Sequence, residues 1–213
     1  SRVEESLALL GLSPEDIDVV LMTHMHHDHS GGLTYVNDQG KLVSKYPNAK
    51  IIVNDVEWYE MRNPNNRTRG TYLRENWEPI QDQVTTFSEY INVIPEIQMI
   101  HTSGHSNGHS IILLKQGKDT MIHMGDLMLS HVHRNPLWVP AVDDYPMKSI
   151  LAKEKWLRQA FENHYKFFFY HDQFFAVVEF DKDGKEFVDY VLRSRPPLIP
   201  FTDQQDRKPD FLG

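Results

Sequence analysis

The stretch Thr23–Gly32 reads THMHHDHSGG and crowds four histidines and one aspartate into positions 24 to 29. It directly follows DIDVVLM, residues 16–22, whose β-branched and aliphatic residues predict a buried strand. Polar side chains gathered at the end of a buried strand are unfavourable unless something binds them. Imidazole nitrogens and carboxylate oxygens are ligands that a divalent ion such as Zn²⁺ accepts. The stretch therefore predicts a metal site.

The spacing inside this stretch favours two metal ions over one. His24 and His26 are two residues apart, so in an extended segment they point to the same side, and His27 points away. Asp28 and His29 follow as the chain turns. Four ligands so close together fit one tetrahedral ion poorly, whereas two neighbouring ions would use them better. A solvated polar loop is the alternative, and this pattern disfavours it.

Three more polar residues come just after apolar segments: His105, Asp126 and His171. We expect strands at 48–54, a hairpin over 110–126 and a strand at 166–172, with helices at 55–63, 72–87 and 146–165. Strands that alternate with helices indicate an α/β or α+β fold with layered sheets. Side chains at neighbouring strand ends can then converge at one edge of a sheet.

Composition narrows the class of protein. The 213 residues suffice for one large domain or two small ones, and the formal net charge of −8 disfavours a nucleic-acid surface. No apolar run is long enough to span a membrane, and no signal-peptide pattern opens the chain, so we expect a cytoplasmic location. With no cysteine, any transition metal must be held by His, Asp or Glu.

The order H-x-H-x-D-H, Gly-His, Gly-Asp and a strand-end His resembles the metal signature of the metallo-β-lactamase-fold hydrolases. The stretches VEESLALLGLSPEDIDVVLMTH and HRNPLWVPAVDDYPM are similar to Bacillus-type quorum-quenching N-acyl-homoserine lactone lactonases. The resemblance implies an α+β fold, the αββα sandwich, over residues 1–195, and the composition indicates a Pro-rich tail at 196–213. Family members place several strands before the motif, so the N-terminal strands are expected to be missing or shortened here.

The resemblance also implies a division of ligands between two divalent ions, expected to be Zn²⁺. His24, His26 and His105 would hold one ion, Asp28, His29 and His171 the other, and Asp126 would bridge both. A hydroxide shared by the ions would attack the lactone carbonyl. Asp28 would shuttle the proton, so Asp28 and Asp126 are the expected catalytic residues.

One departure concerns the substrate side of the site. The lactonases often carry a tyrosine three residues after the bridging aspartate, where this chain has Leu129. Its role is expected to pass to His131, His133 or Tyr170. Met25 and Trp138 are the better candidates for an apolar wall along an acyl chain.

Alternatives to a lactonase remain open at this point. They are another hydrolase of the same fold (phosphotriesterase, arylsulfatase or thioesterase) and a catalytically incomplete metal-binding fragment. The expected partner is a small-molecule substrate, with neither nucleic acid nor membrane, and a homodimer stays open.

Overall fold

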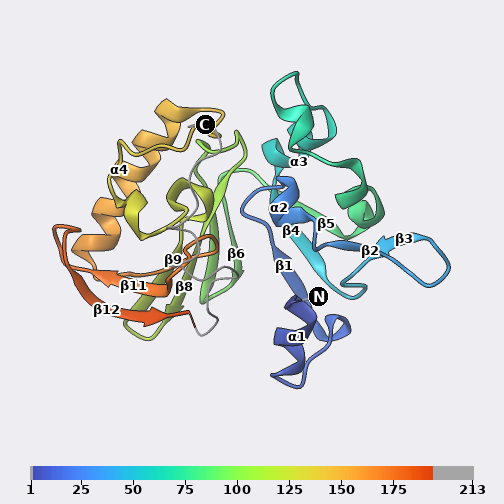
Figure 1. Ribbon diagram of the computed structural model, residues 1–213, viewed down its shortest axis with the longest axis horizontal. Coiled ribbons are helices and arrows are strands. Elements are labelled where there is room, and N and C mark those ends of the chain that lie inside the picture. The colour runs from blue at the N-terminus through green and yellow to red at the C-terminus, as the bar shows by residue number, and fades with distance from the viewer. Residues whose placement is uncertain (1, 194–213) are drawn as a thin grey trace, which may run out of the picture.

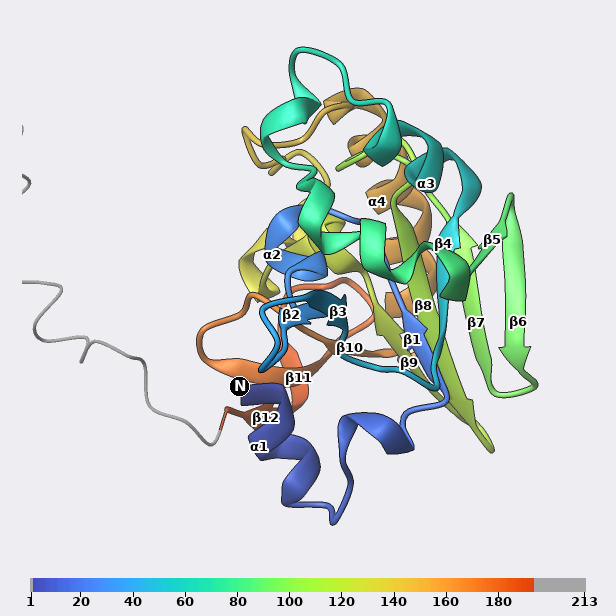
Figure 2. The same cartoon turned by 90° about the vertical axis from the view of Figure 1, so that its right-hand side faces the viewer.

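The computed structural model describes residues 2–193 and has four layers. Helix α4 (Pro146–Glu162) covers a seven-stranded sheet, a three-stranded sheet packs on the other side of it, and helix α3 (Asp55–Arg62) covers the smaller sheet (Figure 1). Figure 2 shows the same sheets after a quarter turn, with α3 and α4 at the same end of the molecule. The arrangement confirms the expected α+β sandwich.

The large sheet has the strand order β12-β11-β10-β9-β8-β7-β6. Its neighbours are antiparallel except β9 and β10, which are parallel because the chain crosses over between them through α4. Its strands are β6 (Tyr90–Ile94), β7 (Ile97–His101), β8 (Ser110–Gln116), β9 (Asp119–His123), β10 (Lys166–Phe168), β11 (Phe175–Phe180) and β12 (Phe187–Leu192).

The small sheet is parallel, with the order β1-β4-β5. Its strands are β1 (Val19–Leu21), β4 (Lys50–Asn54) and β5 (Val84–Phe87), and a hairpin of β2 (Thr34–Val36) and β3 (Leu42–Ser44) lies beside it. The remaining helices are α1 (Arg2–Ala8), α2 (His27–Ser30) and the short 3-10 turns η1 (Pro14–Asp16), η2 (Thr68–Gly70), η3 (Arg74–Asn76), η4 (Glu78–Gln83), η5 (Gly125–Met128) and η6 (His131–Arg134).

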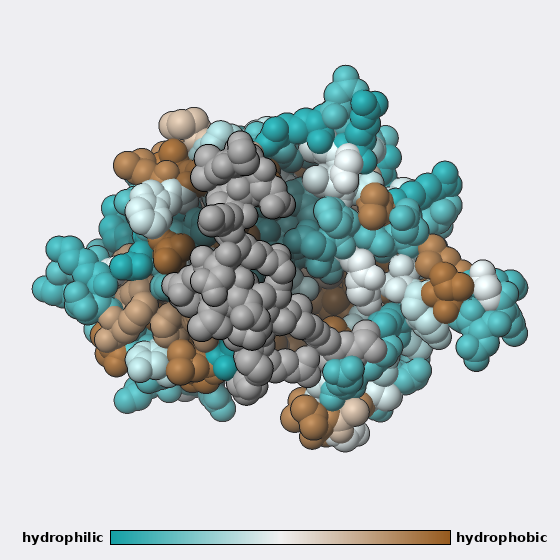
Figure 3. Space-filling view, viewed as in Figure 1, coloured by the Kyte–Doolittle hydropathy of each residue, from teal (hydrophilic) through white to brown (hydrophobic). Residues whose placement is uncertain are grey.

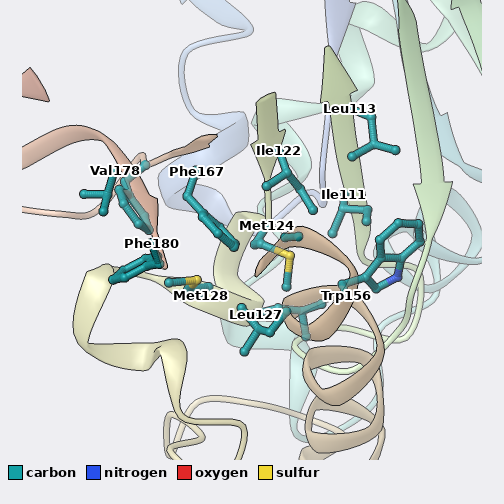
Figure 4. Packing of buried hydrophobic residues seen from close by; sticks show 13 residues of the cluster. Ile111, Leu113, Ile122, Met124, Leu127, Met128, Trp156, Phe167, Val178 and Phe180 are labelled. Atoms are coloured by element: carbon teal, nitrogen blue, oxygen red, sulfur yellow. The ribbon is translucent and has the colours of Figure 1, made fainter. Parts of the chain in front are cut away.

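Alternating side chains join the layers. On β4, Ile51 and Val53 face the cluster that includes Trp58 and Met61 of α3, whereas Ile52 joins the cluster between the two sheets. This is the two-residue alternation of a strand buried on both faces. Figure 4 shows the largest cluster, in which residues of α4, β8, β9, β10, β11 and η5 pack together. The two sheets thus pack on each other through the cluster around Ile52, and α4 packs on the large sheet through the largest cluster.

The expected helix over 72–87 is wrong. The segment forms η3 and η4, with Pro79 at the start of η4, and then strand β5. Val84, Thr85 and Thr86 are β-branched and suit a strand, and β4 offers them a parallel partner. The β2–β3 hairpin was not expected either. The predicted Pro-rich tail, 196–213, lies outside the described residues.

The surface has exposed apolar side chains beside α1. Leu9 and Leu10 follow that helix and are 84% and 75% exposed, and Figure 3 shows hydrophobic side chains at this edge of the molecule. Across residues 2–193, none of the helices combines the length and the apolar character that crossing a membrane requires.

Candidate metal centre

Seven polar side chains converge from the ends of strands in both sheets. His24 and His26 follow β1, Asp28 and His29 lie in α2, His105 follows β7, Asp126 lies in η5 after β9, and His171 follows β10. They form two groups whose donor atoms lie within 4.8 Å of one another in each group: His24, His26 and His105 in one, Asp28, His29, Asp126 and His171 in the other. All seven residues expected as ligands are thus brought together.

The first group is buried. His24, His26 and His105 are 0%, 6% and 2% exposed, and His26 Nδ1 lies 3.0 Å from His105 Nε2. Burial lowers the pKa of His24 well below its ordinary value and that of His26 to about 3, so both rings are neutral. Within the described part of the chain, Nε2 of His24 and Nε2 of His26 have no hydrogen-bond partner. Buried, unpartnered imidazole nitrogens fit a metal ion well.

The second group is open to solvent. Nε2 of His29 lies 3.1 Å from Nε2 of His171, and Oδ2 of Asp28 lies 3.5 Å from each of these nitrogens. The side chains of Asp28 and His171 are 45% and 32% exposed, against 7% for His29. A substrate could therefore approach this group directly from solution.

Asp126 lies between the two groups. Its Oδ2 lies 3.4 Å from His105 Nε2 and 3.3 Å from His29 Nε2, while its Oδ1 lies 3.2 Å from His29 Nε2 and 3.4 Å from His171 Nε2. Burial acts to raise the pKa of Asp126, but hydrogen bonds from His171 and His29 outweigh it and hold the pKa well below its usual range. An ionised carboxylate whose oxygens lie within 3.4 Å of histidines from both groups can link two cations.

A glycine and a buried histidine fix the backbone of Asp126. Gly125 has a φ of +52°, and a Cβ there would lie 2.5 Å from His109 Nε2, so only glycine fits. The Asp126 backbone N–H donates to that Nε2 at 3.2 Å, and His109 Nδ1 lies 3.0 Å from the Thr102 hydroxyl. His109 therefore stabilises the backbone position of Asp126.

Sequence reasoning missed three buried carboxylates, of which Asp143 and Glu57 contact the segments of the first group and Asp172 directly follows His171. Asp143 Oδ1 lies 2.8 Å from His105 Nδ1, Glu57 contacts the loops that carry the first group, and Asp172 Oδ2 accepts from the ring of His131 at 2.6 Å. Burial lowers the pKa of His105, but the hydrogen bond to Asp143 and the charge of Asp126 outweigh it and raise that pKa. A sequence signal existed only for Glu57, which lies on the apolar face of α3.

The expected substrate residues are scattered. Met25 is 1% exposed and belongs to the core cluster behind α2. Trp138 is 57% exposed and lines a cavity of about 750 Å³ between α4, η6 and the β11–β12 turn, to which none of the seven ligand residues contributes. His131 is tied to Asp172, next to His171, while His133 Nδ1 lies 3.0 Å from the Ser130 hydroxyl.

Tyr170 is nearer to the second group. Its ring centroid lies 4.8 Å from that of His29, and its hydroxyl donates to the backbone carbonyl of Asp28 at 3.5 Å. The side chain is 57% exposed, so its ring borders the open side of the group.

Comparisons with known proteins agree with this geometry. The family model for the metallo-beta-lactamase superfamily matches residues 1–171. An N-acyl homoserine lactonase from Bacillus cereus is 29% identical over 121 residues, which are 57% of this chain and 42% of the lactonase. The matched part thus spans less than half of that relative's length.

Solved structures of other proteins share this fold. The crystal structure of a probable metal-dependent hydrolase from Staphylococcus aureus is 40% identical, with a TM-score of 0.87, over 92% of this chain and 69% of that one. AidC, described as a dizinc quorum-quenching lactonase, shares the fold at 20% identity, with a TM-score of 0.73, over 90% of this chain and 69% of AidC.

Proposed function

The chain belongs to the metallo-beta-lactamase superfamily, and from that premise we propose that it is a hydrolase that uses two divalent metal ions to open the ring of N-acyl homoserine lactones. The observation that carries this proposal is the pair of ligand groups with Asp126 between them. The similarity to the lactonase of Bacillus cereus supports the choice of lactone.

We assign the ligands as the two groups lie. His24, His26 and His105 would hold one ion, Asp28, His29 and His171 would hold the other, and Asp126 would contribute to both. Nitrogen and oxygen donors without sulfur suit Zn²⁺, which is our expected metal. When bound, such ions would polarise a carbonyl and lower the pKa of coordinated water to about 7.

We propose that Asp28 transfers a proton during ring opening. Its carboxylate is exposed and lies 3.5 Å from the nitrogens of His29 and His171, on the open side of the centre. Ring opening adds a water oxygen to the carbonyl carbon and breaks the ring C–O bond. Asp28 would accept the proton of the attacking water and return it to the leaving oxygen. The exposed ring of Tyr170 would border the bound lactone.

A pair of variants tests the assignment. His105→Ala removes a proposed ligand of the buried group. His164→Ala is the control, because His164 is distant from His105 in the sequence and its side chain is 62% exposed. We expect His105→Ala to lose most lactone hydrolysis and much of its bound metal, and His164→Ala to keep both. Full activity of His105→Ala would contradict the ligand assignment.

A substrate panel tests the reaction separately. The unaltered chain is assayed on an N-acyl homoserine lactone, a phosphotriester, an aryl sulfate and a thioester. We expect the lactone to give the highest kcat/KM. A metal-loaded chain that hydrolyses only one of the other esters would keep the metal centre and refute the lactone.

A further inference from the structure

Glu57 is a carboxylate buried in the first turn of α3 that no step of the reaction uses. It is 0% exposed and accepts three hydrogen bonds from three different segments. The backbone N–H of Met25 donates to Oε1 at 2.7 Å, the hydroxyl of Tyr72 to Oε1 at 3.0 Å, and the hydroxyl of Ser106 to Oε2 at 2.6 Å. Both oxygens are therefore occupied, and their partners come from distant parts of the sequence.

Each of these partners borders the buried ligand group. Met25 lies between His24 and His26, and Ser106 directly follows His105. The ring of Tyr72 lies 5.2 Å from that of His26. One carboxylate thus connects the two segments that carry all three histidines.

The loop that carries His105 also packs closely against the backbone of α3. A Cβ on Gly108, two residues after Ser106, would lie 2.1 Å from the backbone nitrogen of Glu57. The loop that carries His105 therefore rests directly on the first turn of α3, and the position of Glu57 sets the position of that loop.

Charge gives a second reason to connect Glu57 with the metal. Among residues 2–193, the ion pairs within 4.0 Å do not include Glu57, although its charge acts on the ring of His105 and helps to raise the pKa of that ring. A buried carboxylate without a cation is costly, and hydrogen bonds offset only part of that cost. Cations held by the adjacent histidines would supply the missing positive charge.

We propose that Glu57 is a positioning residue for the metal centre. It holds the His24–His26 segment and the His105 loop at a fixed separation and places a negative charge behind the buried ligand group, so that metal affinity depends on it. The inference rests on the proposed binding of metal by these histidines.

The test compares Glu57→Gln with Glu60→Gln in the full chain. Glu60 is the matched control because it lies one turn further along α3 and accepts from Asn107 of the same loop at 2.8 Å. Each metal-free protein is titrated with Zn²⁺ against a competing chelating dye, and its thermal unfolding is recorded without metal.

We expect Glu57→Gln to bind Zn²⁺ about 10–100-fold more weakly, the range found when an outer hydrogen-bond partner of a metal ligand is lost. Its metal-free Tm should be equal to or above that of the unaltered chain, because glutamine keeps the shape and removes a buried charge. Glu60→Gln should match the unaltered chain in both measurements. A lower metal-free Tm with unchanged Zn²⁺ affinity would show a purely structural role and overturn the proposal.

Two further variants keep the proposal testable if Glu57→Gln does not fold. Ser106→Ala and Tyr72→Phe each remove one hydrogen bond to Glu57 and leave its charge in place. Each should weaken Zn²⁺ binding, and unchanged affinity in both would overturn the proposal. If the unaltered chain binds no Zn²⁺, the proposed function itself fails. If it binds Zn²⁺ and Glu57→Gln binds equally well, only this inference fails.

Discussion

We expect the free energy of unfolding to rise between about pH 8 and 10.5 because Lys153 is buried in the folded chain. The residue is 0% exposed within α4, and its Nζ donates to the backbone carbonyls of Asn135 at 2.9 Å and Trp138 at 2.7 Å. Burial lowers its pKa from the ordinary 10.5 to about 8. At 1.36 kcal/mol for each pH unit, that difference corresponds to about 3 kcal/mol.

The direction follows from proton binding. Below about pH 8, Lys153 is protonated in the folded and the unfolded chain, and the folded chain bears the cost of the buried charge. Between about pH 8 and 10.5 the folded chain releases the proton while the unfolded chain keeps it, so the free energy of unfolding rises with pH. Replacing the lysine with methionine removes this rise.

The assay is urea unfolding of the metal-free chain and of Lys153→Met at several pH values from 7 to 10.5. The free energy of unfolding of the unaltered chain, minus that of Lys153→Met, should increase by up to about 3 kcal/mol over this range. Lys155→Met, an exposed position on the same helix, is the control and should not change the pH dependence. A difference that stays constant from pH 7 to 10.5 would refute the reasoning.

Three further substitutions test the packing and the site. Asp143→Asn removes the carboxylate behind His105 and should weaken Zn²⁺ binding about 10–100-fold in the dye competition; unchanged affinity would exclude this role. Gly108→Ala forces a Cβ against the backbone of Glu57 and should lower the free energy of unfolding by about 1–3 kcal/mol, so a neutral result would contradict the close contact. Phe167→Ala empties the core beneath α4 (Figure 4) and should cost about 3–5 kcal/mol in urea unfolding, whereas a loss below about 1 kcal/mol would place Phe167 outside the core.

The positions of the seven candidate ligands were predictable because their chemistry is local. His24 to His29 are adjacent in the sequence, and His105, Asp126 and His171 each follow an apolar segment that reads as a strand. Strand ends that meet at one edge then bring them together.

The supporting residues were not predictable in this way. Glu57 accepts hydrogen bonds from residues 32 and 49 positions away, and Asp143 meets His105 across 38 positions. Such contacts depend on how the layers dock, which no local pattern encodes. The error over 72–87 has a similar cause, because β5 gains its parallel partner β4 from tertiary structure. Trp138 was expected to form an apolar wall because it lies near the motif loops in the sequence, but such proximity does not specify which cavity a side chain lines.

The most direct test of the proposed function is metal content by elemental analysis of the purified chain, paired with lactone opening before and after chelation. The two ligand groups predict about two metal ions per chain and turnover that is lost on chelation and returns with added Zn²⁺. A folded chain that binds no metal, or lactone opening that persists without metal, would contradict the proposal of a dinuclear lactonase.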